Sequence, residues 1–232
     1  MFIKHIPNAI TSLNLLSGCL GVVFAFDGNL KYAGYAILIA AFLDFFDGMA
    51  ARLLNVSSPI GKQLDSLADM VSFGFLPAVI LYQLISQSSG IYNENEWIKY
   101  LAFLIAIFSA LRLAKFNIDT RQNDSFIGLP TPACALVIIS LPYIIERGGF
   151  MATIFQSSLS LVILAFILSY LLVAELPLLS LKFKNLSFRE NQYRYILVAL
   201  GIILFAFSNF ASIPLIILIY ILLSIIQFNI KT

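Results

Sequence analysis

The chain has 232 residues, of which 60% are hydrophobic and only 11% are charged. A soluble domain carries about 25% charged residues, so the composition excludes an ordinary soluble protein and indicates an integral membrane protein. The net charge of +2 gives no reason to expect a nucleic-acid partner, which would call for a strongly basic surface. We therefore expect an all-α, polytopic bundle of helices in a lipid bilayer.

The hydropathy pattern divides the chain into about eight apolar segments, and a helix needs about 20 apolar residues to cross a bilayer. Some of the later segments are shorter than this. The predicted helices are 8–26, 32–54, 60–86, 97–117, 131–146, 155–178, 194–209 and 212–228. Because the connections are brief, we expect one transmembrane domain over 1–232, with a catalytic core over about 1–178 and two additional helices within 193–228.

Lysine and arginine are distributed unequally between the two sets of loops. Cytoplasmic loops of membrane proteins carry an excess of these residues. If the N-terminus is cytoplasmic, only Lys31, Lys99 and Arg147 fall on the outer side. The cytoplasmic side then holds Lys4, Arg52, Lys62, Arg112, Lys115, Arg121, Lys182, Lys184, Arg189, Arg194 and Lys231. We therefore expect a multi-pass protein of the cell (inner) membrane in this orientation.

Four aspartates surround the turn between the second and third predicted helices, which is centred near 56–57. Asp44 and Asp47 are spaced i, i+3, and Asp65 and Asp69 are spaced i, i+4, so each pair shares a helix face. At 1.5 Å per residue, Asp47 and Asp65 lie at the same depth, roughly 14 Å from the turn, and Asp44 and Asp69 both lie at roughly 18 Å. Carboxylates at membrane depth are costly, and four together repel each other. The spacing therefore predicts a pair of divalent cations between them, on the cytoplasmic side.

Small residues adjoin these acids. Gly48 and Gly61 allow a ligand or another backbone to come close, and Ala51 keeps the adjacent wall low. Arg52 offers a planar cationic fork suited to a carboxylate or a phosphate. Ser58 precedes a proline and is predicted to cap the third helix. Hard oxygen ligands with free space beside them suit Mg²⁺ or Mn²⁺ and a phosphate-bearing substrate.

The segment has the form Asp44-x2-Asp47-Gly48-x2-Ala51-Arg52-x8-Gly61-x3-Asp65-x3-Asp69, and it resembles the signature of the CDP-alcohol phosphatidyltransferase family. Three further stretches resemble the membrane-type phosphatidylserine synthases of that family. They are DMVSFGFLPA over 69–78, LRLAKFN over 111–117 and FIGLPTPA over 126–133. With the N-terminal stretch 6–14, the resemblance covers roughly the first 145 residues.

The resemblance implies an enzyme of phospholipid biosynthesis, a transferase that converts CDP-diacylglycerol and L-serine into phosphatidylserine and CMP. Asp44, Asp47 and Asp65 would ligate two divalent cations, Mg²⁺ or Mn²⁺ with Ca²⁺ as an alternative occupant. Asp69 would contribute to the second ion and take the proton from the serine hydroxyl. By the same resemblance, Gly48, Ala51 and Gly61 would form the wall of the nucleotide site, and the protein would be a homodimer.

Three polar residues near the acids are further candidates for the substrate site. Asn8 and Thr11 share a face of the first helix, where they would either form interhelical hydrogen bonds or contact the cytidine and ribose. Ser66 lies near enough to the aspartates to contact the substrate. We include all three in the candidate site for the CDP-lipid.

The acceptor site is less defined. Arg112, Lys115 and Asn117 close the fourth predicted helix on the cytoplasmic side, either as membrane anchors or as the residues that capture serine. A zwitterionic amino acid needs a cation for its carboxylate, which Arg112 or Lys115 offers. Thr131 either caps the fifth helix or lies where the positive end of that helix meets an anion. Glu175, inside an apolar segment, has no assigned role.

Two alternatives remain open on the residues alone. The first is the same chemistry with glycerol 3-phosphate, inositol phosphate or choline as the acceptor. The second is a cation transporter, which would place carboxylates or broken helices near the bilayer midplane, with exits on both sides. The acids here gather toward one side.

Overall fold

A computed structural model of the chain describes residues 5–56, 58–90, 96–119, 125–180 and 187–231. The elements, in chain order, are α1 (Ile6–Phe26), α2 (Leu30–Leu53), α3 (Pro59–Asp69), the π-helical η2 (Met70–Phe75), α4 (Leu76–Gln87), the 3₁₀-helical η4 (Glu96–Phe103), α5 (Leu104–Ile118), β1 (Ser125–Ile127), α6 (Thr131–Arg147), α7 (Phe150–Phe155), α8 (Ser158–Val173), β2 (Pro177–Leu179), α9 (Phe188–Ser208), η5 (Asn209–Ser212) and α10 (Ile213–Lys231). The all-α prediction is confirmed, because the only strands described are two of three residues each.

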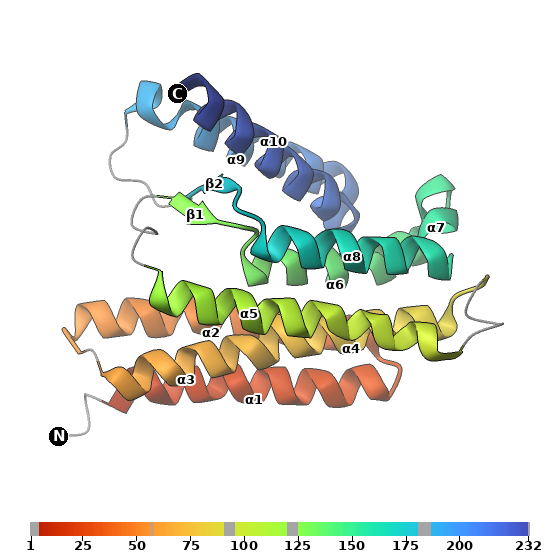
Figure 1. Ribbon diagram of the computed structural model, residues 1–232, viewed down its shortest axis with the longest axis horizontal. Coiled ribbons are helices and arrows are strands. Elements are labelled where there is room, and N and C mark those ends of the chain that lie inside the picture. Colours follow the sequence, from red (N-terminus) through yellow and green to blue (C-terminus); the bar gives the residue numbers. More distant parts are fainter. Residues whose placement is uncertain (1–4, 57, 91–95, 120–124, 181–186, 232) are drawn as a thin grey trace.

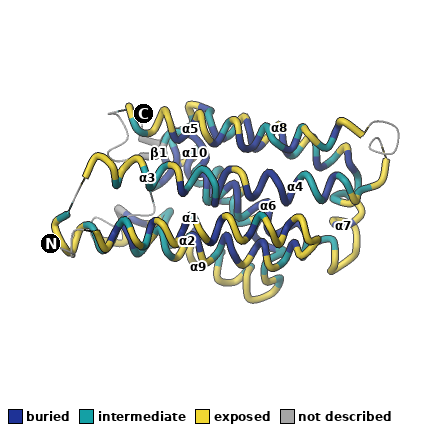
Figure 2. Tube along the Cα trace, turned by 90° about the horizontal axis from the view of Figure 1, so that it is seen from below, coloured by how far each residue is buried: buried dark blue, intermediate teal, exposed yellow. Residues whose placement is uncertain are grey.

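The long helices run side by side and form successive layers (Figure 1). Helices α1 to α5 form one layer, α6 and α8 lie beside it, and the α9–α10 pair covers the far side of α6 and β2. Helix α4 is central, since eight of its 12 residues are buried. Figure 2 shows the same pattern, with buried segments in the interior and exposed faces turned outward.

The outward faces are apolar, as expected for contact with lipid. On α1, for example, Leu13, Leu16 and Leu20 share an exposed face. Four described stretches are long and apolar enough to cross a membrane, namely Ile6–Phe26, Pro59–Gln87, Glu96–Ile118 and Asn191–Phe228. The protein is therefore embedded in a membrane, although these four stretches do not establish the predicted number of about eight spans.

Two predicted helices depart from a continuous α-helix close to a proline. The segment predicted over 60–86 contains the π-helical η2, which begins directly after Asp69 and ends before Pro77, a residue that cannot donate to the preceding turn. The segment predicted over 155–178 is helical only from Ser158 to Val173, and its end becomes the strand β2. The residue before Pro177 is biased away from the helical region, which explains the early end of α8.

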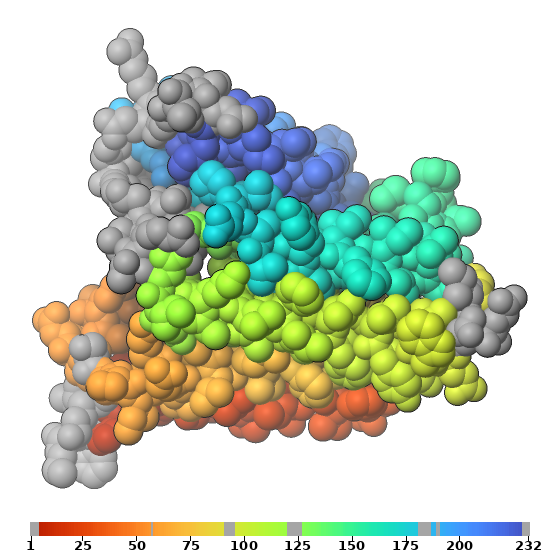
Figure 3. Space-filling view, viewed as in Figure 1, coloured from red at the N-terminus to blue at the C-terminus, as the bar shows by residue number. Residues whose placement is uncertain are grey.

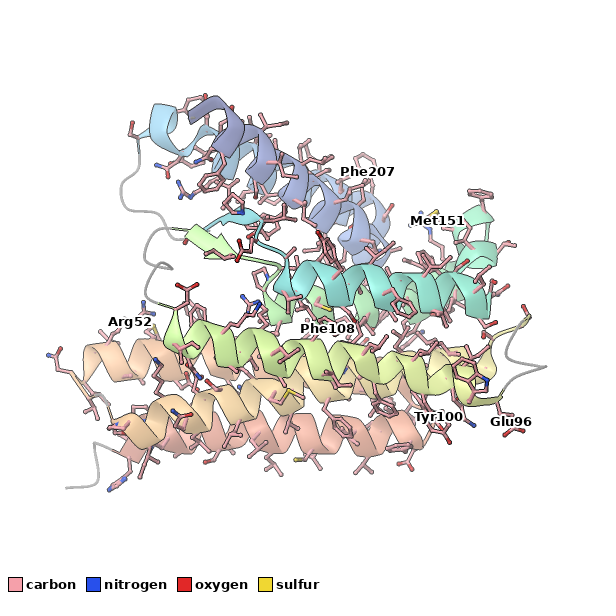
Figure 4. The ribbon with its side chains drawn as sticks, in the orientation of Figure 1. Arg52, Glu96, Tyr100, Phe108, Met151 and Phe207 are labelled. Carbon is pink, nitrogen blue, oxygen red and sulfur yellow. The ribbon has the colours of Figure 1, made fainter. Side chains whose placement is uncertain are left out.

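The described cations divide between the two ends of the molecule. Lys62 and Arg194 lie at one end, where they donate to the carbonyls of Asn117 and Ser180. At the other end Lys31 pairs with Glu146, and Arg147 lies against the last turn of α9. Figure 4 places Arg52 at the first end and Glu96 and Tyr100 at the second. Lys4, Arg121, Lys182 and Lys184 lie outside the described residues.

Close packing of α1 on η2 depends on a glycine. A Cβ atom at Gly18 would lie 2.5 Å from Ser72 Oγ and 3.1 Å from Ser72 Cα, which is backbone and cannot move alone. We expect Gly18→Ala to lower the free energy of unfolding by about 1–3 kcal/mol, the usual cost of overpacking. Thermal unfolding in detergent measures this, with Cys19→Ala on the exposed neighbour as the control. Equal stability of the two variants would contradict the predicted clash.

Candidate active site

The turn between α2 and α3 forms as predicted, but the two helices pack on α1 rather than against each other. Helix α2 ends at Leu53, and α3 begins at Pro59. Ser58 is the N-cap of α3, and its hydroxyl oxygen accepts a hydrogen bond from the Gly61 backbone N–H at 2.9 Å. The aspartates of α2 therefore precede this short turn, and the aspartates of α3 follow it.

Three of the four aspartates converge. Asp44 and Asp47 of α2 and Asp65 of α3 each place a carboxylate oxygen within 4.8 Å of the others. Asp47 is buried at 7% exposure, and it accepts a hydrogen bond from the Thr11 hydroxyl of α1 at 2.7 Å. Three acidic groups so close together are stable as anions only with positive charge among them.

Asp69 lies one turn beyond Asp65 and is not part of the cluster, whereas the sequence predicted that all four carboxylates would line one pocket. Its carboxylate accepts a hydrogen bond from the Asn14 side-chain amide of α1 at 3.4 Å. Its charge interacts with those of Asp44, Asp65 and Asp47. Asp69 is therefore held by α1, outside the cluster of three and outside the lining of the cavity described next.

A cavity of about 260 Å³ opens beside the cluster. It is lined by Pro7, Asn8, Thr11, Asp47, Gly48, Ala51, Val56, Ser58, Gly61, Lys62 and Asp65. The two glycines serve different purposes. A Cβ atom at Gly48 would meet nothing within 4 Å, whereas one at Gly61 would lie 2.9 Å from Asn8 Oδ1. Gly48 therefore leaves space in the cavity, and Gly61 allows α3 to approach α1.

Two residues predicted for the CDP-lipid site lie outside this cavity. Arg52 is exposed, and its Nε donates to the Gly48 carbonyl on the same helix at 3.0 Å. It borders a shallow depression with Ala51, Asn55 and Val56. Ser66 accepts a hydrogen bond from the Asn117 side-chain amide at 2.8 Å, so it joins α3 to α5.

The residues predicted for the acceptor separate into two groups. Arg112 and Lys115 line a second cavity of about 340 Å³ at the same end of the molecule, between α5, β1 and the end of α8. Asn117 turns instead toward α3 through its bond to Ser66. Thr131 is buried at the first turn of α6, where Pro130 rather than Thr131 is the N-cap, and it lines neither cavity.

Sequence reasoning missed several residues that contact the aspartates or line the two cavities. Asn14 was not included in the candidate site, although its i, i+3 spacing from Thr11 places both on one face of α1. Lys62 precedes Asp65 by three residues, and the same argument would have found it. Glu175 lines the second cavity, and its charge within an apolar segment was the signal.

The donor set fits a divalent metal ion. Asp44, Asp47 and Asp65 offer only carboxylate oxygens, which are the preferred ligands of Mg²⁺ and Mn²⁺. The Thr11 hydroxyl donates to Asp47 Oδ2, which fixes the orientation of that carboxylate within the cluster. The arrangement can hold positive charge beside a cavity large enough for part of a phosphate-bearing substrate.

Comparison with known proteins gives a consistent result. The sequence model of the family described as CDP-alcohol phosphatidyltransferase matches residues 4–181, well over half of the chain. The match includes all four aspartates and both cavities. It ends before α9 and α10.

Several curated relatives are similar in sequence. The CDP-diacylglycerol–serine O-phosphatidyltransferase of Bacillus subtilis (strain 168) is 39% identical over 142 residues, which cover 60% of this chain and 77% of that protein. The protein of the same name from Helicobacter pylori (strain J99) is 36% identical over 135 residues, covering 57% of this chain and 55% of its own length. The archaetidylserine synthase of Methanothermobacter thermautotrophicus is 32% identical over 175 residues, which cover 74% of this chain and 68% of that protein. The chain thus spans about half the length of the Helicobacter relative and more of the other two.

Proposed function

This chain belongs to the CDP-alcohol phosphatidyltransferase family, and we propose that it transfers the phosphatidyl group of CDP-diacylglycerol to the hydroxyl of L-serine. The products are phosphatidylserine and CMP. The proposal depends on the convergence of Asp44, Asp47 and Asp65 beside the first cavity. A second cavity, lined by charged residues, lies at the same end of the bundle. The names of the relatives, all of which contain serine, support this acceptor over others.

We assign the first cavity to the CDP portion of the lipid. Asn8, Thr11, Gly48, Ala51 and Gly61 border it, and the missing side chain at Gly48 leaves room for a nucleotide. Asp44, Asp47, Asp65 and Asp69 would hold two divalent cations, Mg²⁺ or Mn²⁺. When bound, these ions supply charge stabilisation to the pyrophosphate and to the departing CMP.

We assign the acceptor proton to Asp69. A serine hydroxyl is a weak nucleophile and needs a base within hydrogen-bond reach. A carboxylate tied closely to metal is a poor base, so the suitable acid is the one outside the tight cluster of three. Asn14 holds Asp69 from the side of α1, which orients the carboxylate. The bond from phosphorus to the CMP oxygen breaks as the serine oxygen attacks, and the serine proton passes to Asp69.

The surroundings of the site follow from the membrane setting. The lipid would enter sideways from the inner leaflet of the cell (inner) membrane, with the site facing the cytoplasm, as the distribution of lysine and arginine indicates. We propose a single transmembrane domain over 1–232 with its catalytic core in about 1–178, and a homodimer as the working form.

An activity assay tests the proposal. The purified protein receives CDP-diacylglycerol, Mn²⁺ or Mg²⁺, and labelled L-serine, and both labelled lipid and CMP are measured. We expect equal amounts of the two products. CMP release only with glycerol 3-phosphate, inositol phosphate or choline would rule out serine, and no CMP release with any alcohol would rule out the transferase and leave the transporter reading.

A further inference from the structure

The second cavity contains charges of both signs. Arg112 and Lys115 of α5 lie on one wall, and Glu175 lies on the other, just after α8. Asp119 also borders the cavity, and Ile127 and Leu172 supply apolar surface. Figure 3 shows the surface hollowed between the ends of α5 and α8. Asp119 belongs to the end of α5, so among the described residues Glu175 is the one lining acid that comes from the opposite wall. A cavity with charges of both signs is complementary to a small zwitterion.

The buried guanidinium of Arg112 has a hydrogen-bond donor that no described residue of the protein pairs with. Its side chain is only 8% exposed, and its Nε has no hydrogen-bond partner among the described residues. Buried polar groups are normally hydrogen-bonded, so an orphaned guanidinium N–H in a cavity wall indicates a missing ligand. The charges of Arg112 and Asp69 lie close enough to interact.

The acidic wall is held rigidly by backbone contacts. Gly128, with a positive φ of 77°, donates its N–H to the Leu176 carbonyl at 2.9 Å. A Cβ atom there would lie 2.6 Å from the Leu172 carbonyl oxygen, so only glycine allows this approach. The hydrogen bonds from the β1–α6 connection thus fix the chain on both sides of Glu175.

Helix α10 holds the same wall from behind. The Ser224 hydroxyl accepts the Leu179 N–H at 3.1 Å, and the Tyr220 hydroxyl donates to the Leu179 carbonyl at 2.9 Å. Both side chains are buried. Helix α10, which lies beyond the family match, therefore braces the strand that follows Glu175. A wall fixed in advance binds a small ligand at a lower entropic cost.

From these contacts we infer that the cavity between α5, β1 and α8 is the acceptor site, and that it recognises both charges of an amino acid. Arg112 and Lys115 bind the carboxylate, and Glu175 binds the ammonium group. The inference rests on the proposed function and extends it to the basis of acceptor choice. Glu175 would also repel a phosphate dianion, which disfavours phosphorylated acceptors such as glycerol 3-phosphate.

The test combines variants that lack one charge of the cavity with serine analogues that lack one charge of the amino acid. Glu175→Gln and Lys115→Gln each remove one charge from an exposed side chain, so neither disturbs the core. Glu146→Gln is the matched control, since Glu146 is also exposed but lies at the opposite end. The competitors of labelled serine are 3-hydroxypropanoate, which lacks the ammonium group, and ethanolamine, which lacks the carboxylate.

We expect Glu175→Gln to raise the KM for serine by roughly tenfold or more, the usual loss for a hydrogen bond to a charged group, while the KM for CDP-diacylglycerol changes little. The variant should also lose its preference for serine over 3-hydroxypropanoate and keep its preference over ethanolamine. Lys115→Gln should lose the preference for serine over ethanolamine and keep the preference for serine over 3-hydroxypropanoate. Glu146→Gln should match the unmodified protein.

Two outcomes separate this inference from the proposed function. If the unmodified protein forms phosphatidylserine but Glu175→Gln behaves like Glu146→Gln, or weakens all acceptors equally, the charge assignment is wrong and the proposed function stands. If the unmodified, folded protein releases no CMP with serine, the proposed function and this inference fail together.

Discussion

Asp47→Asn should abolish turnover while the protein remains folded. Asp47 contributes an oxygen to the cluster with Asp44 and Asp65, and the amide that replaces it is a weaker ligand without charge. Stabilisation of a phosphoryl transition state by bound metal is worth several kcal/mol, so we expect the rate to fall by roughly 10³-fold or more. Release of CMP at saturating serine measures this.

The thermal stability of Asp47→Asn, measured with and without metal, is a second and independent test of the role of Asp47. The amide keeps an oxygen for the Thr11 hydroxyl, and one of several mutually repelling charges is gone, so the metal-free variant should be no less stable than the unmodified protein. Binding of a ligand to the native state alone adds about 2.7 kcal/mol at 100 times its Kd. The rise in melting temperature with added Mn²⁺ should therefore disappear in the variant. Asp27→Asn, at an exposed acid at the far end of α1, is the control. A variant that keeps both activity and the metal-dependent rise would contradict the assigned role.

The helices and the acidic cluster could be predicted because they depend on local rules. Asp44 and Asp47 are spaced by three residues and Asp65 and Asp69 by four. A short turn that ends at Ser58, the N-cap of α3, joins the two helices, and both of them pack on α1. The spacings and the turn are properties of residues close in sequence. The convergence of Asp44, Asp47 and Asp65 was therefore predictable from helix periodicity and the short turn.

The acceptor cavity could not be predicted in the same way. It brings Lys115 of α5 to Glu175 after α8, across 60 residues of sequence, through the pairing of β1 with β2. Nothing in the hydropathy of 155–178 predicts that its end leaves the helix to form a strand, because apolar strands and helix ends look alike over so few residues. Ser66 and Asn117 were each assigned to a substrate, whereas the structure joins them to each other.

Asp69→Asn should produce a different defect from Asp47→Asn. Loss of a general base lowers the rate by about 10²- to 10⁴-fold, and here we expect the loss in kcat rather than in either KM. The cluster of Asp44, Asp47 and Asp65 is unchanged in this variant, so much of the metal-dependent rise in melting temperature should remain. The amide also keeps an oxygen for the Asn14 donor, which preserves the contact with α1.

The two variants together distinguish a base from a ligand. If Asp69 mainly ligates metal, its variant should lose the Mn²⁺-dependent rise as completely as Asp47→Asn, and higher metal concentrations should restore part of the activity. If Asp69 takes the serine proton, added metal should restore nothing, while CDP-diacylglycerol should still protect the protein against thermal unfolding. Because the charges of Arg112 and Asp69 interact, the base would then lie where the carboxylate-binding wall of the acceptor cavity meets the metal cluster, which is where a serine hydroxyl must be delivered.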